Sequence, residues 1–394
     1  MANYTIMDLA KIFFFLLFPG FIFYNFFVAI GILPVLSGGY YGISSLLIAL
    51  IYLLVLPILG VGCEKKNALF LLLFFLFVIY VFFVTNVHWF FNFEVDSGYA
   101  IWQSFYLIVF WISLFFVGRY LSFSKKKFPA ILSGSILIIF LYFLYFFFQT
   151  GQMMFRFEAI SSADSDLASY QGTARSVFVT ILFLVSFYKR HLTKIFFIGL
   201  GVALLFFSGA RSEFFVFLFV SILYLFFISM ADPKKIILFF ALILAIFIIF
   251  LFIANTFSES RHLQIANLAE SSSWIARKEF QEVAIEKIQE YYIFGDFGKD
   301  VVDGKSGAYS HDILSSWVSY GLLGFLMYSN LILWSFLGSA YMCFSKKEFN
   351  GVFGFSFLIN FSCLILAIIA KAVFWPLPAL GWGLYVNAIS IKDE

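Results

Sequence analysis

The chain has 394 residues, of which 63% are hydrophobic and only 12% are charged, and its formal net charge is +3. A soluble domain of this length carries about a quarter charged residues, so this composition excludes a water-soluble particle and indicates an integral membrane protein. The three cysteines, Cys63, Cys343 and Cys363, lack ligand spacing, so neither disulfides nor a zinc site are expected.

Apolar segments that are each long enough to cross a bilayer, about 20 residues, recur along the chain. They are predicted over Ile12–Leu33, Tyr41–Gly62, Ala68–Val87, Tyr99–Gly118, Phe128–Phe148, Gly172–Tyr188, Ile195–Met230, Ile236–Ala254, Ile313–Leu337, Gly351–Ala370 and Val373–Ile389. The stretch Ile195–Met230 is too long for one span, and a run of small and charged residues from Ser208 to Glu213 breaks it. Counted as two short helices, it brings the total to about 12 transmembrane helices. The predicted fold class is an all-α polytopic membrane protein, with residues 1–394 forming a single integral membrane domain.

Lysine and arginine decide the orientation, because cytoplasmic loops carry an excess of both. With the N-terminus inside, the predicted inside loops and the two termini hold 15 of the 25 Lys and Arg residues. Both termini are therefore predicted to be cytoplasmic. The long loops 149–171 and 255–310 then face outside, and the short inside loops leave no room for a nucleotide-binding domain.

The loop 255–310 contains a predicted amphipathic helix over about 273–292. Its apolar residues recur at helical spacing, with charged residues opposite; they are Phe280, Val283, Ala284, Ile288, Tyr291 and Tyr292. Such a helix lies on the membrane surface or caps a cavity. Ser310-His311-Asp312 then follows at the mouth of the next span.

His311 is suited by type to general-base chemistry, because imidazole exchanges a proton near neutral pH. A structural role stays open for it, since histidine is tolerated at an interfacial helix start. Asp312 is predicted to complement the dipole of the helix that follows.

Four of the arginines that are predicted to lie outside are candidate site residues, in a chain whose positive charge belongs inside. Arg211 lies in the broken stretch, Arg277 on the amphipathic helix, and Arg156 and Arg175 at the other long loop. Guanidinium groups bind phosphate oxygens bidentately, so these residues are candidate phosphate ligands. Snorkelling of Arg211 to the interface, and plain surface solvation of the other three, are the alternative interpretations.

Two further features carry less weight. Asp164-Ser165-Asp166 resembles a paired-aspartate metal motif but follows no predicted strand, so neither a metal site nor a cofactor is predicted. Lys371, near the outer end of a span, is compatible with snorkelling or with a cavity, and the sequence does not choose between them.

The stretch from Arg277 to Tyr328 resembles the bacterial O-antigen polymerase and O-antigen ligase superfamily. The matching motifs are Arg277 at the start of a helix, Phe294-Gly295-Asp296-Phe297-Gly298, His311-Asp312-Ile313-Leu314 and Tyr320-Gly321-Leu322-Leu323-Gly324. Ser208-Gly209-Ala210-Arg211 is similar to the Ser-Arg element that the family carries between two short spans. The chain departs from the pattern in having Asp312 where Asn is commoner, and in one extra residue in the glycine turn.

The resemblance implies an inverting, metal-independent glycosyltransferase of the bacterial inner (cytoplasmic) membrane, with the loop 255–310 in the periplasm. It would be an O-antigen polymerase, which joins undecaprenyl-pyrophosphate-linked oligosaccharide repeat units at the periplasmic face and releases the lipid pyrophosphate. The implied partners are the lipid-linked glycan donor and acceptor and membrane lipid. A chain-length regulator protein is an additional candidate, and no nucleic acid is expected.

The resemblance also implies roles for individual residues. His311 would remove the proton from the acceptor hydroxyl. Arg211 and Arg277 would bind the pyrophosphate, with Arg156 or Arg175 assisting. Asp312 would orient His311 or contact sugar.

Two other functions stay open. The same motifs fit an O-antigen ligase, whose acceptor is lipid A-core. A lipid-linked oligosaccharide flippase can also have about 12 spans and basic cavity residues. A flippase is expected to distribute charges through many spans and related halves, whereas here the candidate residues concentrate late in the chain.

Overall fold

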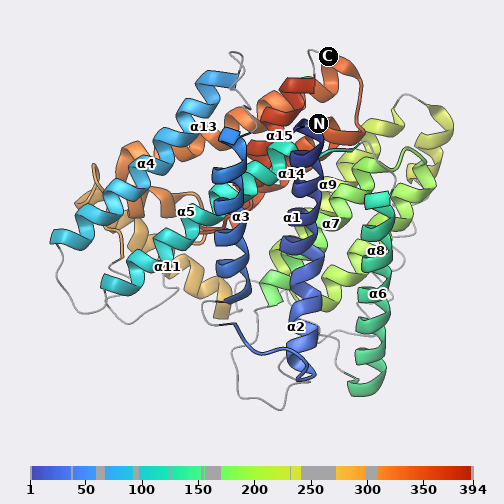
Figure 1. Cartoon of the computed structure of the whole chain (residues 1–394), viewed down its shortest axis with the longest axis horizontal. Coiled ribbons are helices and arrows are strands. Elements are labelled where there is room, and N and C mark those ends of the chain that lie inside the picture. Colours follow the sequence, from blue (N-terminus) through green and yellow to red (C-terminus); the bar gives the residue numbers. More distant parts are fainter. Residues whose placement is uncertain are drawn as a thin grey trace.

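The computed structural model describes residues 2–36, 39–58, 67–91, 97–123, 127–151, 155, 170–230, 232–240, 272–298 and 309–391. These residues form a bundle of helices and contain no strand (Figure 1). The helices are α1 (Ala2–Phe15), η1 (Leu16–Gly20), α2 (Phe21–Ala29), α3 (Gly39–Ile58), α4 (Ala68–Phe91), α5 (Ser97–Tyr120), α6 (Lys127–Thr150), α7 (Tyr170–Phe187), α8 (His191–Ser208), α9 (Arg211–Ser229), α11 (Ser272–Glu290), α13 (Leu314–Lys346), α14 (Gly351–Ile369) and α15 (Pro378–Ile391).

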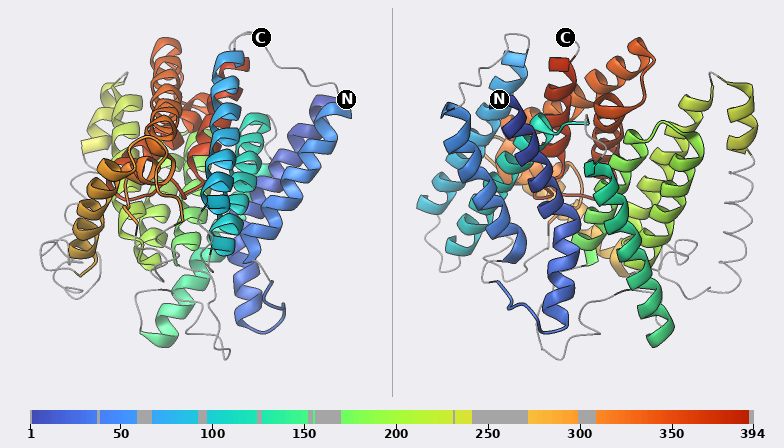
Figure 2. Two further views of the ribbon diagram at one scale, coloured as in Figure 1. Left: turned by 90° about the vertical axis from the view of Figure 1, so that its left-hand side faces the viewer. Right: turned by 45° about the vertical axis from the view of Figure 1, so that its right-hand side comes forward.

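Within the described residues, ten helical segments are long and apolar enough to cross a membrane. The chain is therefore an all-α polytopic membrane protein, as the composition predicts. The predicted span Ile236–Ala254 lies mostly outside the described residues. α1 begins and α15 ends near the same end of the bundle (Figures 1 and 2).

The final predicted span, Val373–Ile389, has different bounds in the structure. Residues 370–377 are not helical, and α15 contains 14 residues, which rise about 21 Å against a bilayer core of about 30 Å. Pro376 and Pro378 explain the late start, because proline disfavours the helical conformation of the residue before it and suits the first position of a helix.

The break predicted in Ile195–Met230 is present. α8 ends at Ser208, Gly209 adopts the left-handed conformation with φ of 73°, and Ala210 is extended. Glycine adopts a positive φ without the steric cost that a Cβ imposes. The stretch therefore forms two short helices, α8 and α9, and Arg211 is the first residue of the second.

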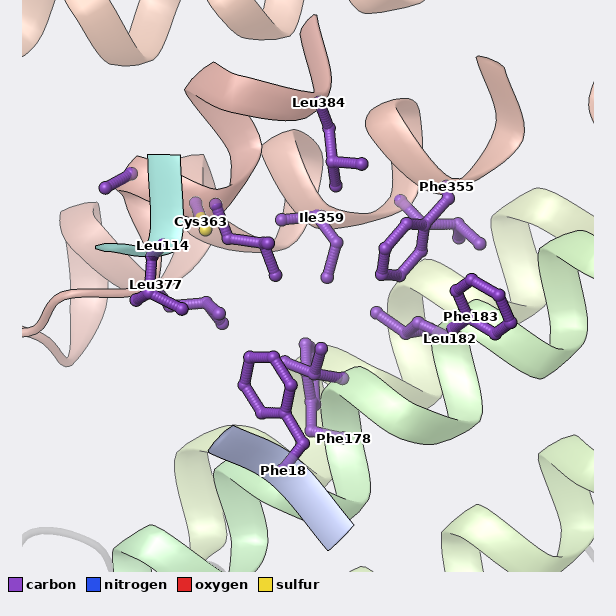
Figure 3. Close-up of a cluster of buried hydrophobic side chains, with 14 of the residues drawn as sticks. Phe18, Leu114, Phe178, Leu182, Phe183, Phe355, Ile359, Cys363, Leu377 and Leu384 are labelled. Atoms are coloured by element: carbon purple, nitrogen blue, oxygen red, sulfur yellow. The ribbon is translucent and has the colours of Figure 1, made fainter. Parts of the chain in front are cut away.

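The core lies where α7, α14 and α15 meet α5 and η1. Figure 3 shows side chains from these elements facing one another: Phe18, Leu114, Phe178, Leu182, Ile359 and Leu384. Lipid is as apolar as these side chains, so close packing and interhelical hydrogen bonds must hold the helices together. The Asn387 side chain, for example, donates to the carbonyl oxygens of Gly118 (3.0 Å) and Leu121 (2.9 Å), which joins α15 to α5.

A second backbone break, inside α13, anchors the segment that follows α11. Gly321 has a φ of 69° and interrupts the helix, and the turn at Gly295, whose φ is 73°, fits against it. The Asp296 amide donates to the Val318 carbonyl (2.6 Å), and the Leu322 amide donates to the Tyr292 carbonyl (3.0 Å). Both glycines belong to the motifs that carry the family resemblance. Because they lack a side chain, the backbone of the turn at Gly295 can contact the backbone of α13 at Gly321.

Candidate functional site

A cavity of about 950 Å³ lies where α7, α9 and α13 begin and where α8 and α14 end. α11 closes one side of it, and the non-helical segment 370–376 closes another. All the predicted site residues that the structure describes line this cavity: Arg175, Arg211, Arg277, His311 and Asp312. Arg156 lies outside the described residues.

Arg211 reaches the cavity because the α8–α9 turn ends directly before it. Gly209, Ala210 and Ser212 line the cavity beside it. The first turn of a helix exposes backbone N–H groups and the positive end of the helix dipole, both of which favour an anion. The structure thus places Arg211 at a cavity wall whose backbone also favours negative charge.

Arg175 is held in place by aromatic rings. Its guanidinium lies 4.3 Å from the ring centroid of Tyr41 and 5.4 Å from that of Phe110. Tyr41 is fixed in turn by a hydrogen bond of 3.0 Å to the Ser176 hydroxyl. The Arg175 Nε is buried and has no hydrogen-bond partner among the described residues. A cation–π contact is not a hydrogen bond and so leaves the buried Nε–H available as a donor to a ligand.

Arg277 is in the second turn of α11, on the side that faces the cavity. The helix predicted over 273–292 is observed as Ser272–Glu290. Its inward side carries Arg277, Phe280 and Gln281, all of which line the cavity, and Ala284 is 3% exposed. Val283, which belongs to the predicted apolar face of this helix, is 46% exposed.

His311 lies in the short segment before α13, among aromatic side chains. Its ring centroid is 5.1 Å from that of Tyr309 and 6.2 Å from that of Phe280. Burial lowers the pKa of His311 below its ordinary value, and the positive charges of Arg277 and Lys371 lower this pKa further, while Asp312 acts in the opposite direction. The imidazole is therefore neutral near pH 7, which is the form that accepts a proton.

Asp312 ties the start of α13 to its surroundings. Its Oδ1 accepts hydrogen bonds from the Ser310 hydroxyl (2.6 Å) and the Leu314 amide (2.9 Å). Its Oδ2 accepts one from the Gln281 side chain on α11 (3.2 Å). The contact to Leu314 places the carboxylate at the first residue of α13, where negative charge suits the helix dipole. Within the described residues no hydrogen bond joins Asp312 to His311, so its carboxylate fixes the loop that carries the imidazole.

Two residues that the sequence did not assign, Lys371 and Glu213, meet at the cavity wall. The Lys371 ammonium lies 2.5 Å from Glu213 Oε1, and the two side chains are only 10% and 2% exposed. The Ser212 hydroxyl donates to the other Glu213 oxygen (2.8 Å). In the sequence, each of the two residues is a charge between apolar runs. Such a charge inside a membrane usually lines a cavity or pairs with another charge.

The described lining is strongly cationic. Its charged side chains are Arg175, Arg211, Arg277, Lys278, Lys371, Glu213 and Asp312. With His311 neutral this is an excess of three positive charges, and both carboxylates already have partners inside the protein. A low-dielectric cavity with this excess favours a ligand that carries several negative charges.

No protein-family model matches the chain, and no curated protein is detectably similar to it. Among the described residues, no group of three or more His, Cys, Asp or Glu side chains is arranged to hold a metal ion.

Proposed function

We propose that this protein is a membrane glycosyltransferase that uses a lipid-pyrophosphate-linked glycan as donor, and that it acts as an O-antigen polymerase. The observation that carries the proposal is the convergence in one cavity of three arginines and a neutral histidine, contributed by α7, α9, α11 and the segment before α13. In the proposed topology the cavity opens to the periplasmic side of the inner membrane, and both termini are cytoplasmic.

The reaction requires a base beside the acceptor hydroxyl and an anion site beside the leaving pyrophosphate, on opposite sides of the anomeric carbon. His311 accepts the proton of the acceptor hydroxyl while the hydroxyl oxygen attacks the anomeric carbon of the donor sugar. The bond from that carbon to the pyrophosphate oxygen breaks, and the pyrophosphate leaves with the electron pair. Attack on the face opposite the leaving group inverts the configuration.

The arginines act on the leaving group. Negative charge develops on the pyrophosphate as the bond breaks, and fixed guanidinium groups stabilise it without reorganisation. Arg211 stands on the rigid start of α9, and aromatic rings hold Arg175 in position. Arg277 comes from α11, whose attachment at Gly321 sets its distance from the other two.

A reconstituted reaction tests the proposal and separates it from its alternatives. The purified protein in detergent receives an undecaprenyl-pyrophosphate-linked repeat unit as sole substrate, and the product sizes are read on a gel. A ladder of longer glycans establishes polymerisation. Transfer only after lipid A-core is added would make the protein a ligase. No transfer in either case, with movement of the lipid-linked glycan across vesicles, would make it a flippase and refute the enzymatic proposal.

A further inference from the structure

The Lys371–Glu213 pair joins the two walls of the cavity that carry the proposed reacting groups. Glu213 is in the first turn of α9, two residues after Arg211. Lys371 is in the segment 370–376, directly after α14 ends at Ile369. The pair therefore connects the start of one helix to the end of another, where an acid and a base respectively suit the helix dipoles.

The Lys371 segment is in turn attached to the wall that carries His311. The Val373 amide donates to the Ser315 hydroxyl (2.8 Å), and this hydroxyl donates to the Asp312 carbonyl (2.6 Å). One ion pair and two hydrogen bonds thus connect Glu213, through the Lys371 segment and Ser315, to Asp312, which is next to His311 in the chain.

We infer that Lys371 is a positioning residue, which its ion pair with Glu213 holds against α9 so that Arg211 and His311 keep a fixed separation across the cavity. The inference deepens the proposed function and rests on it for the identity of the bound anion. The Lys371 ammonium is paired with the Glu213 carboxylate, so its role is to hold two walls together and to add positive charge near the imidazole.

The charges around His311 show how the role can be measured. Arg277 faces it from α11, Lys371 from the segment 370–376 and Asp312 from its own loop. Arg175 on α7 and Arg211 and Glu213 on α9 line the same cavity. Removing the Lys371 charge should raise the His311 pKa, because it removes a positive charge that disfavours the imidazolium. A pair that only stabilised the fold at a distance from the imidazole would leave the His311 pKa unchanged.

The experiment measures the reactivity of the neutral imidazole without any glycan. Diethyl pyrocarbonate modifies neutral histidine, and mass spectrometry of the His311 peptide gives the rate across pH. We expect K371M to slow modification of His311 about twofold or more below pH 6, since a rise in pKa lowers the neutral fraction there. K371R, which keeps the charge, should follow the wild type.

The matched control is K235M. Lys235 pairs with Asp232 (3.3 Å) outside the cavity lining, so its loss should leave His311 unchanged. If K371M fails to give a monodisperse protein, E213Q replaces it. This variant leaves Lys371 charged and unneutralised, and modification of His311 should stay at least as fast as in the wild type.

Equal His311 profiles in K371M and the wild type, or slower modification in E213Q, would overturn the inference. The readout needs no donor and no transfer. A shifted profile in a protein that forms no glycan would therefore refute only the proposed function, and an unchanged profile in an active enzyme would refute only the role of Lys371.

Discussion

Replacing Gly295 with alanine should detach α11 from the kink in α13. A Cβ at this position would lie 2.6 Å from both the Gly321 nitrogen and the Val318 carbonyl oxygen, where ordinary contacts begin at 3.4 Å. The turn must therefore move outward by roughly 0.8 Å, the difference between these two distances. The φ of 73° adds strain of about 1–2 kcal/mol for a residue with a side chain.

The displacement also weakens the contacts that dock the turn. The hydrogen bond from the Asp296 amide to the Val318 carbonyl contributes about 1 kcal/mol. The Asp296 carboxylate also pairs with Lys287 (3.3 Å), which joins the turn to α11 and so carries its displacement to that helix. With the backbone strain, the free energy of unfolding should fall by about 2–4 kcal/mol. Transfer should fall about a hundredfold, because a misplacement of about 1 Å at a reacting group costs that much.

Thermal unfolding in detergent and the reconstituted transfer reaction measure the two effects separately. The matched control is Gly134 to alanine on α6, where a Cβ would have no neighbour within 4 Å. It should be neutral, or stabilising by up to about 1 kcal/mol, because alanine is the better helix former. A G295A protein that unfolds at the wild-type temperature and transfers glycan at the wild-type rate would refute the docking argument.

Three further predictions concern the cavity. R211A should lower kcat/KM by about two to three orders of magnitude, the usual cost of a lost transition-state donor. The control R190A, at the exposed residue before α8, should leave kcat/KM unchanged. R211K should recover only part of the activity, since Lys lacks the bidentate fork, and full recovery would contradict phosphate binding. The positive charge of Arg277 helps to lower the His311 pKa, so R277Q should raise this pKa. The acidic limb of the pH–rate profile should then move to higher pH, and a limb that stays in place would contradict this. D312N should cost no more than about 1 kcal/mol of stability and retain most transfer, because the Asn Oδ1 can still accept the hydrogen bond from the Leu314 amide. A folded but inactive D312N would assign the carboxylate a direct role.

Much of the fold could be predicted from the sequence because bilayer physics constrains it strongly. The apolar runs, the break at Gly209 and the helix over Ser272–Glu290 all follow from local composition and spacing. The shortened final helix was missed, because the helical conformation was assumed through Pro376 although proline disfavours it in the residue before.

The candidate site could be predicted only in part. Arginine outside the cytoplasmic loops was a usable signal, and Arg175, Arg211 and Arg277 do line one cavity. The pairing of Lys371 with Glu213 joins residues 158 positions apart, which no local pattern specifies.

The most direct test of the central claim compares H311A with H191A in the reconstituted polymerisation reaction. His191 begins α8, about 26 Å along the helix from the cavity, so its variant controls for loss of a partly buried histidine. The proposed mechanism predicts that H191A forms the wild-type ladder of glycans and that H311A, equally well folded, forms none. A full ladder from H311A would contradict the assignment of His311 as the base.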